Sequence, residues 1–247
     1  MTSDERLVEL RGLTVRTRSR TLVQGIDVDV VAGKVTALVG PSGVGKSLTA
    51  RCMMGLVDVS PGLSAGSLRY PGLGETRDWY QGHVGGGASA MRRLARETAG
   101  LRGSFITYSP QVAAGALNPG RTIGRQVALA VARRPRPPAD PGADVRDLLA
   151  EVGLEARTAA SLPQELSGGQ CQRAALAVAI APQPRVVVAD EPETGLDPVL
   201  RRGIIELLVR VCRGRGCGLL LISHHEDTVR RIADVEVRFR ESGGIRA

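Results

Sequence analysis

Residues 35–47 read Val-Thr-Ala-Leu-Val-Gly-Pro-Ser-Gly-Val-Gly-Lys-Ser. The first five residues are a short apolar run, which predicts a buried central strand. The next eight match the pattern Gly-x-x-x-x-Gly-Lys-Ser, in which small residues let backbone amides surround a phosphate. Residues 48–56 then follow a helical pattern, so the loop stands between a strand and a helix, as this motif requires. The stretch predicts a nucleotide-binding α/β fold.

The loop also supplies side chains for a nucleoside triphosphate. Lys46 can bridge the β- and γ-phosphate oxygens, and it is one of two lysines among 33 basic residues. The Ser47 hydroxyl can ligate Mg²⁺. We expect the nucleotide to contact the whole loop and the residue after it: Gly40, Pro41, Ser42, Gly43, Val44, Gly45, Lys46, Ser47 and Leu48.

The rest of the chain alternates predicted strands and helices, which indicates a mostly parallel sheet with helices on its faces. Residues 7–15 and 22–31 alternate like half-buried strands at a sheet edge. The Gly-rich residues 58–104 predict an irregular β-rich lobe with a short helix near 88–99. Further helices are expected at 122–132, 144–152, 169–181 and 200–211, and further strands at 186–189, 218–222 and 235–239. Asp197 followed by Pro198 predicts the start of the last helix, with Asp197 as its cap.

The composition limits the class of protein. The chain has 247 residues with 43% hydrophobic and 23% charged side chains, enough for one large domain or one domain with a small inserted lobe. No stretch approaches the roughly 18 apolar residues that a membrane span needs, and Met1 is not followed by the apolar block of a signal peptide. Four cysteines without C-x-x-C spacing indicate reduced thiols. We therefore expect a cytosolic protein.

The net charge of +8 could attract nucleic acid, anionic lipid or nucleotides. The arginines are scattered, however, which favours a solvated basic surface. Aromatic residues make up only 2% of the chain, too few for a protein that stacks single-stranded bases on rings.

Two adjacent carboxylates follow the apolar residues 186–189. If this strand neighbours the one before the phosphate loop in one sheet, Asp190 and Glu191 lie beside the loop. Asp190 could then hold Mg²⁺, directly or through water, and Glu191 could polarise the attacking water. Taken alone, an apolar run ending in Asp-Glu fits a solvated strand end equally well.

The sequence Leu166-Ser-Gly-Gly-Gln170 resembles the signature motif of the ATP-binding cassette (ABC) ATPases. Ser167 and the amides of Gly168 and Gly169 stand at a predicted helix start, where they can donate to a phosphate. The resemblance implies that Ser167, Gly168, Gly169 and Gln170 serve the nucleotide held by the opposite subunit.

Three further motifs follow the same family in order. Gln111, within Tyr108-Ser-Pro-Gln, resembles the family's Q-loop glutamine, which contacts Mg²⁺ and water and reports to the membrane subunits. Gly195-Leu-Asp197 resembles the D-loop. His224, within Leu221-Ile-Ser-His, resembles the switch histidine that contacts the γ-phosphate, with His225 as a rival for that role.

The resemblance covers about residues 7–239 and implies the ABC ATPase fold: a P-loop NTPase core, an antiparallel β edge lobe and a small helical subdomain. We expect residues 1–247 to form one ABC ATPase domain, with a core of about 1–110 and 183–247 and a helical subdomain of about 112–182. The implied cofactors are ATP and Mg²⁺. The implied catalytic residues are Glu191, His224 and Gln111, the implied Mg²⁺ ligands are Ser47, Gln111 and Asp190, and Asp197 joins the ATP-binding residues.

Within the family, three stretches resemble the ATPase subunits of peptide and nickel importers: 45–56, Leu117-Asn-Pro119, and 163–169. This implies ATP-driven import of peptides or of nickel and other metal chelates, at the cytoplasmic face of the cell membrane. The implied partners are a second ABC ATPase subunit, identical or not, two transmembrane permease subunits and, indirectly, a solute-binding protein.

The alternatives are an ABC efflux cassette, or a soluble ABC ATPase that acts on nucleic acid or ribosomes. The latter proteins carry two cassettes or a long coiled-coil insertion. This chain has one set of motifs and no heptad run between residues 56 and 166. We therefore expect no nucleic-acid partner.

The chain departs from the family pattern at two places. The family stacks an aromatic ring on adenine from a strand before the phosphate loop, but here no aromatic residue precedes Tyr70. Arg16 or Arg18 could stack instead, although an ordinary exposed arginine fits equally well. Glu193 and Gly195 replace the usual residues near the D-loop, which suggests the hypothesis that two unequal ATP sites form in the assembly.

Overall fold

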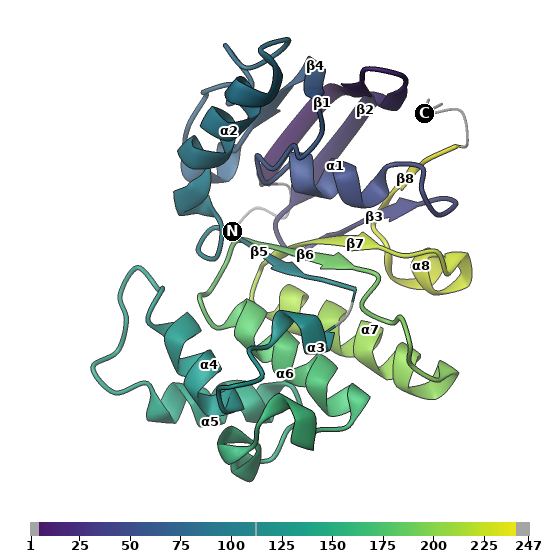
Figure 1. Ribbon diagram of the computed structural model, residues 1–247. Helices are drawn as coiled ribbons and strands as arrows, with labels where there is room; N and C mark the ends of the chain where they lie inside the picture. The colour runs from purple at the N-terminus through teal and green to yellow at the C-terminus, as the bar shows by residue number, and fades with distance from the viewer. Residues whose placement is uncertain (1–4, 112, 241–247) are drawn as a thin grey trace. The chain divides into compact units, whose positions relative to one another are not determined.

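The structure is a computed structural model that describes residues 5–111 and 113–240. The chain divides into two compact units (Figure 1). The first unit comprises the described residues up to Arg102 and from Gly218 onward, and the second comprises Gly103–Cys217. Each unit contains part of the expected site and is described separately.

The first unit contains an antiparallel sheet of three strands in the order β2-β1-β4. They are β1 (Arg6–Thr17), β2 (Thr21–Val31) and β4 (Pro61–Arg69). The strands predicted at 7–15 and 22–31 are confirmed. The prediction that both lie at an edge is wrong for β1, which pairs with β2 on one side and β4 on the other.

The same unit contains three parallel strands in the order β7-β3-β8. They are β3 (Val35–Val39), β7 (Gly218–Ile222) and β8 (Val235–Arg238). Every residue of β3 and β7 is buried, which explains why both are continuous apolar runs rather than alternating ones. The phosphate loop follows the middle strand of the three.

Helices α1 (Lys46–Cys52) and α8 (Glu226–Ile232) belong to this unit as well. The helix predicted for 48–56 ends earlier than expected, at Cys52. Gly55 has a φ of 72°, and the Leu56 amide turns back to the Arg51 carbonyl oxygen at 2.9 Å. A left-handed glycine that closes the last turn in this way is a common helix terminator.

Residues 58–104, all of which are described, are less β-rich than expected. They form one strand, β4, followed by α2 (Gly87–Glu97) and the short 3₁₀ turns η1 (Pro71–Leu73) and η2 (Ala99–Leu101). The helix predicted near 88–99 is confirmed. It is amphipathic, with Ala90, Met91 and Leu94 buried and its arginines exposed.

The second unit has two parallel strands, β5 (Ile106–Ser109) and β6 (Val186–Asp190). The other elements are α3 (Ala113–Ala116), α4 (Ile123–Val131), α5 (Gly142–Glu151), η3 (Ala156–Ala160), η4 (Pro163–Glu165), α6 (Gly168–Ile180) and α7 (Pro198–Gly214). The four helices predicted here are confirmed. The described part of 112–182 contains helices and 3₁₀ turns, and its assignment as a helical subdomain stays a prediction.

Within residues 5–111 and 113–240, none of the helices combines the length and the hydropathy needed to cross a bilayer.

Candidate nucleotide-binding site

The phosphate loop, Gly40–Ser47, follows a path that requires glycine at two positions. Gly40 has a φ of 142°, and a Cβ there would lie 2.6 Å from the Phe239 carbonyl oxygen. Gly45 has a φ of 103°, and a Cβ there would lie 2.6 Å from Val23 Cγ2. Both distances are far shorter than a van der Waals contact, so the bend of the loop depends on these glycines.

Lys46 occupies the inside of this bend. Its Nζ donates to the carbonyl oxygens of Gly40 and Pro41, both at 2.7 Å, and the residue is only 4% exposed. The loop residues Pro41, Ser42 and Gly43 are exposed. A buried ammonium group behind an exposed loop of small residues fits the binding of a polyphosphate, because the loop amides and the cation can act on the same anion.

The register of the parallel strands brings His224 to the same sheet edge as the loop. β3 pairs with β7 so that Leu38 lies opposite Ile222. Two residues further along each strand stand Gly40 and His224, and carboxyl ends of parallel strands meet at one edge. His224 is exposed at this edge.

His225 lies beside His224, with the two ring centroids 4.0 Å apart. His225 is half-buried at the start of α8, and its backbone amide donates to the Ser223 hydroxyl at 3.1 Å. That contact uses the backbone rather than the ring, so the choice of His224 over His225 stays a prediction.

In the second unit, Asp190 is the last residue of β6 and is 6% exposed. The Tyr108 hydroxyl donates to its Oδ2 at 2.6 Å. β5 pairs in parallel with β6, with Tyr108 opposite Val188, so Asp190 stands two residues beyond the partner of Tyr108 on the same face. This bond holds one oxygen of the carboxylate in a defined direction.

Glu191, Gln111 and Thr194 form a polar triangle just beyond these strands. Gln111 Nε2 donates to Glu191 Oε2 at 3.0 Å and approaches Thr194 Oγ1 at 3.4 Å. Thr194 Oγ1 donates to the same Glu191 oxygen at 3.3 Å. Glu191 has a φ of 46°, an uncommon conformation for a residue with a side chain, which is often found at functional positions.

Sequence reasoning missed Tyr108 and Thr194 as contacts of the two carboxylates. Tyr108 stands in the quoted motif before Gln111, at a position whose side chain faces that of Asp190 once the strand register is known. Thr194 follows Glu191 by three residues, and its backbone amide donates to the Glu191 carbonyl at 3.1 Å. A turn at this point, closed by a Thr, was the available signal.

The signature residues form the start of α6. Ser167 is the N-cap, and its Oγ accepts from the Gln170 amide at 3.3 Å while Gln170 Oε1 accepts from the Ser167 amide at 2.9 Å. Ser167, Gly168 and Gln170 are exposed. Because the Ser167 oxygen accepts in this capping box, its hydrogen can be donated outward.

The glycines of this motif are not required by the fold of the chain. Neither has a positive φ, and a Cβ at Gly168 or Gly169 would meet only the side chains of Leu196 and Leu200, at 3.8 Å. That is ordinary van der Waals contact. Alanine would therefore fit at either position within this chain, and the approach of a partner's nucleotide to these glycines stays a prediction.

Asp197 is the N-cap of α7, as its sequence context predicts. Its Oδ1 accepts from the amides of Val199 and Leu200 at 3.0 and 3.1 Å. Val199 is an apolar residue with 81% exposure. The structure thus gives Asp197 a role in starting the helix, while its role towards ATP stays a prediction.

The phosphate loop and His224 belong to the first unit, while Gln111, Asp190, Glu191, Asp197 and the signature residues belong to the second. Within each unit the predicted residues gather at strand and helix ends. The expectation that the two sets act on one nucleotide stays a prediction.

Comparison with known proteins agrees with these features. The family model for ABC transporters matches residues 23–194. A Brucella ovis protein named as a peptide import ATP-binding protein is 34% identical over 99% of this chain and 73% of its own length. The methionine import ATP-binding protein MetN of Thermobifida fusca is 34% identical over 88% of this chain and 60% of its own length.

Two solved structures share the fold. CbiO1 of Clostridium perfringens, part of the ABC transporter complex CbiONQ, has a TM-score of 0.74 and 22% identity over 97% of this chain and 86% of its own. An ATP-binding cassette solved as a dimer with ADP and phosphate, in a post-hydrolysis state, has the same TM-score and identity over 98% of this chain and 97% of its own. This chain belongs to the ABC transporter family, as an ATP-binding ATPase subunit with the ABC ATPase fold.

Proposed function

We propose that this chain is the ATP-hydrolysing subunit of an ABC importer, and that Lys46, Glu191 and the residues around them carry the reaction. The similarity to proteins named for peptide import extends over 99% of the chain at 34–36% identity, which supports import over efflux. The similarity to proteins named for methionine import is of the same order over a shorter stretch. The direction of transport is therefore better supported than the solute.

The first unit binds the triphosphate. Lys46 already lies inside the loop, held by the carbonyl oxygens of Gly40 and Pro41. On binding, its ammonium group exchanges these partners for the β- and γ-phosphate oxygens while the loop amides donate to the same phosphates. His224, at the same sheet edge, donates to the γ-phosphate.

The second unit supplies the general base. Glu191 accepts a proton from the attacking water, and the Gln111 contact at 3.0 Å is the observation that carries this assignment. The side-chain amide nitrogen of Gln111 donates to the Glu191 carboxylate. The side-chain amide oxygen of Gln111 can then accept from water or bind a cation. Ser47, Gln111 and Asp190 would hold Mg²⁺, which neutralises phosphate charge when it is bound.

A second copy or a related subunit completes each site. Ser167 and the open faces of Gly168 and Gly169 are the donors offered to the partner's nucleotide. The paired subunits act with two permease subunits at the cytoplasmic face of the membrane, and a solute-binding protein delivers the solute. Peptides or metal chelates such as nickel complexes are the proposed solutes.

The deciding experiment uses Glu191→Gln in the full chain, expressed with the membrane subunits that co-purify with it. We expect ATP hydrolysis to fall by about 10²–10⁴-fold, while the variant still retains bound ATP and pairs more stably. Glu206→Gln, an exposed glutamate on α7, is the matched control and keeps full activity. Undiminished turnover in Glu191→Gln would show that another group is the base. Co-purification of RNA or DNA in place of membrane subunits would favour the soluble alternative.

A further inference from the structure

The C-terminal end of α1 is held by side chains from residues 70–102. Three consecutive carbonyl groups at this end accept hydrogen bonds: Cys52 from the Tyr80 hydroxyl (2.9 Å), Met53 from the Tyr70 hydroxyl (2.7 Å) and Met54 from Arg102 Nη1 (3.1 Å). We call Tyr70, Tyr80 and Arg102 the capping residues. The last carbonyls of a helix have no partner within it, so such donors stabilise its end.

Both tyrosine hydroxyls are buried and remain protonated hydrogen-bond donors. Each is completely buried, and burial raises the pKa of both phenols well above the ordinary value. They therefore stay protonated donors. Arg102 adds a positive charge near the C-terminus of a helix, where the helix dipole favours a cation. Two of the three tyrosines in the whole chain serve this one helix end.

The turn after α1 also meets the C-cap residue of α2, at Gly55 and Thr98. A Cβ on Gly55 would lie 2.3 Å from Thr98 Oγ1, so the Thr98 side chain packs against the backbone at position 55 as closely as glycine allows. Thr98 Oγ1 in turn donates to the Leu94 carbonyl at 2.9 Å and accepts from Arg102 Nη1 at 2.7 Å. The turn after α1 is thereby fastened to the end of α2.

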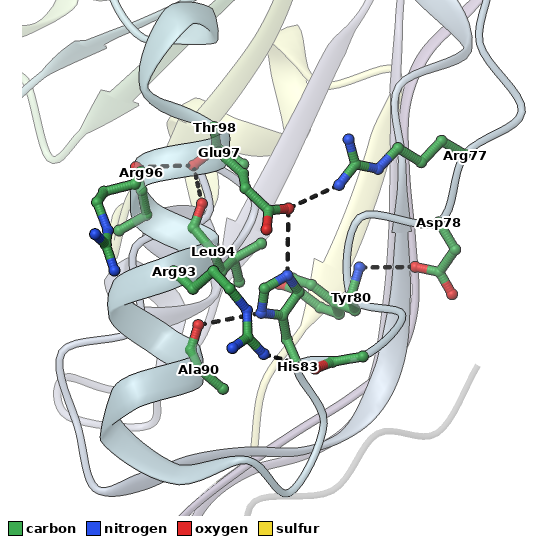
Figure 2. Close-up of polar contacts among 12 residues, drawn as sticks. Arg77, Asp78, Tyr80, His83, Ala90, Arg93, Leu94, Arg96, Glu97 and Thr98 are labelled. Atoms are coloured by element: carbon green, nitrogen blue, oxygen red, sulfur yellow. Dashed lines mark hydrogen bonds and ion pairs between the residues drawn. The ribbon is translucent and has the colours of Figure 1, made fainter.

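Figure 2 shows the network that holds this region together. The ring of His83, which is 3% exposed, lies between the Ala90 carbonyl (3.1 Å) and the Glu97 carboxylate (3.3 Å). Arg77 Nη2 donates to the same carboxylate at 2.7 Å. His83 thus joins the segment before α2 to the helix at two places, Ala90 in its first turn and Glu97 at its last residue.

The backbone of Tyr80 is fixed by a neighbouring carboxylate. Asp78 Oδ1 accepts from the Tyr80 amide at 3.0 Å (Figure 2). The same oxygen accepts from the Leu68 amide of β4, also at 3.0 Å. Arg77 lies over the ring of Trp79, 4.2 Å from its centroid, and Trp79 meets Tyr70 edge-on at 5.7 Å. Polar and ring contacts therefore hold the segment that carries the two tyrosines at several points.

The other end of α1 starts with Lys46 and Ser47. The helix has seven residues, a length of about 10 Å, so a displacement at one end moves the other end as well. We propose that the capping residues are positioning residues for nucleotide binding: they fix the far end of α1 and so keep Lys46 and Ser47 aligned with the phosphate-binding amides. This inference rests on the proposed role of Lys46 and Ser47.

The test is a comparison of tyrosine variants in the full chain. Tyr70→Phe, Tyr80→Phe and the double variant keep the rings and remove only the hydroxyl donors. We expect the double variant to bind Mg²⁺–ADP about tenfold more weakly, and its KM for ATP to rise similarly, because a displaced Lys46 must first be realigned. The kcat at saturating ATP should stay within about twofold, since the machinery of the second unit is unchanged.

Ser64→Ala is the matched control. Its Oγ donates to the Thr14 carbonyl at 3.1 Å, in the same unit but between β4 and β1. Its loss should lower the thermal midpoint and leave KM and the ADP affinity unchanged. Tyrosine variants with a wild-type KM, or with a change no larger than that of Ser64→Ala, would overturn the proposal.

If the tyrosine variants do not fold, variants of the half-buried Arg102 test the same proposal. Arg102→Ala should raise KM, and Arg102→Lys, which keeps a cationic donor, should restore part of the affinity. Equal KM values in the two variants and the parent chain would overturn the proposal. The proposed function is tested separately by Lys46→Ala: if that variant still binds nucleotide, the phosphate assignment itself has failed.

Discussion

The side-chain amide of Gln111 donates to the carboxylate of Glu191 at 3.0 Å, although the two residues lie 80 positions apart in the chain. They meet because β5 and β6 are parallel and Ser109 lies opposite Ala189. Gln111 follows Ser109 by two positions, and Glu191 follows Ala189 by two positions. The contact orients the carboxylate that we assign as the general base.

Replacing Gln111 with alanine therefore removes an orienting contact and leaves the phosphate loop intact. We expect kcat for ATP hydrolysis to fall about tenfold or more, with nucleotide affinity within about threefold of the parent. Steady-state hydrolysis and Mg²⁺–ADP titration measure the two quantities. Gln164→Ala, an exposed glutamine in the same unit, is the control. A loss of affinity without a loss of kcat would contradict the assignment.

The two lysines of the chain offer a matched pair. Lys46→Ala removes the ammonium group inside the phosphate loop. We expect Mg²⁺–ADP binding to weaken by at least about 100-fold, because the proposed charge-assisted contacts between this ammonium group and the phosphates are lost. Lys34→Ala, just before β3, should bind nucleotide like the parent. Similar affinities for the two variants would rule out the proposed phosphate site.

Gly168→Ala separates folding from function. The added Cβ would meet only Leu196 Cδ2 at 3.8 Å, and alanine at a helical position stabilises by about 0.4–1 kcal/mol. We expect an unchanged or slightly raised thermal midpoint together with a loss of ATP hydrolysis of about tenfold or more, since a partner's phosphate can no longer approach.

Gly203→Ala in α7, where a Cβ meets nothing within 4 Å, should be both stable and active. Full activity in Gly168→Ala would show that no partner approaches at this glycine.

Tyr108→Phe tests the bond to Asp190. The variant removes the hydrogen bond from the Tyr108 hydroxyl to Asp190 Oδ2 (2.6 Å), which orients the carboxylate. Loss of a hydrogen bond that orients a metal ligand lowers metal affinity by about tenfold or more. The Mg²⁺ concentration for half-maximal hydrolysis should rise by about that factor, and the maximal rate should recover at high Mg²⁺. An unchanged Mg²⁺ dependence would exclude Asp190 from the cation site.

Stability should fall at alkaline pH. Burial raises the pKa of the Cys52 thiol to about 12, and it raises the pKa of Tyr70 and Tyr80 as well. The folded state then keeps protons that the unfolded state loses above about pH 8.5, so the free energy of unfolding decreases as pH rises.

Urea unfolding at pH 8 and pH 10.5 should show a loss of about 2 kcal/mol or more. Cys52→Ala removes one of these groups, so its stability should depend less steeply on pH. Identical slopes for the variant and the parent would show that Cys52 does not contribute.

Local pattern was sufficient for much of the fold. The apolar run at Val35–Val39, the glycines at 40 and 45 and the Asp197 cap each follow from short-range chemistry, and the structure has the expected strand, loop and helix start at these places. Patterning was weakest across 58–104, where the Gly-rich sequence indicated strands and the structure has a helix and 3₁₀ turns after β4. The helix predicted near 88–99 is confirmed there as α2, whose apolar residues follow a helical spacing, while the strands expected beside β4 are absent from these residues.

The sequence by itself determined which groups can bind a phosphate, because a phosphate loop needs only small residues, amides and one cation in consecutive positions. Only the tertiary structure decided which side chains support those groups. Tyr108 reaches Asp190 across 82 positions, and Tyr80 reaches Cys52 across 28. Such contacts depend on strand register and on the packing of distant segments, which no local spacing of residues specifies.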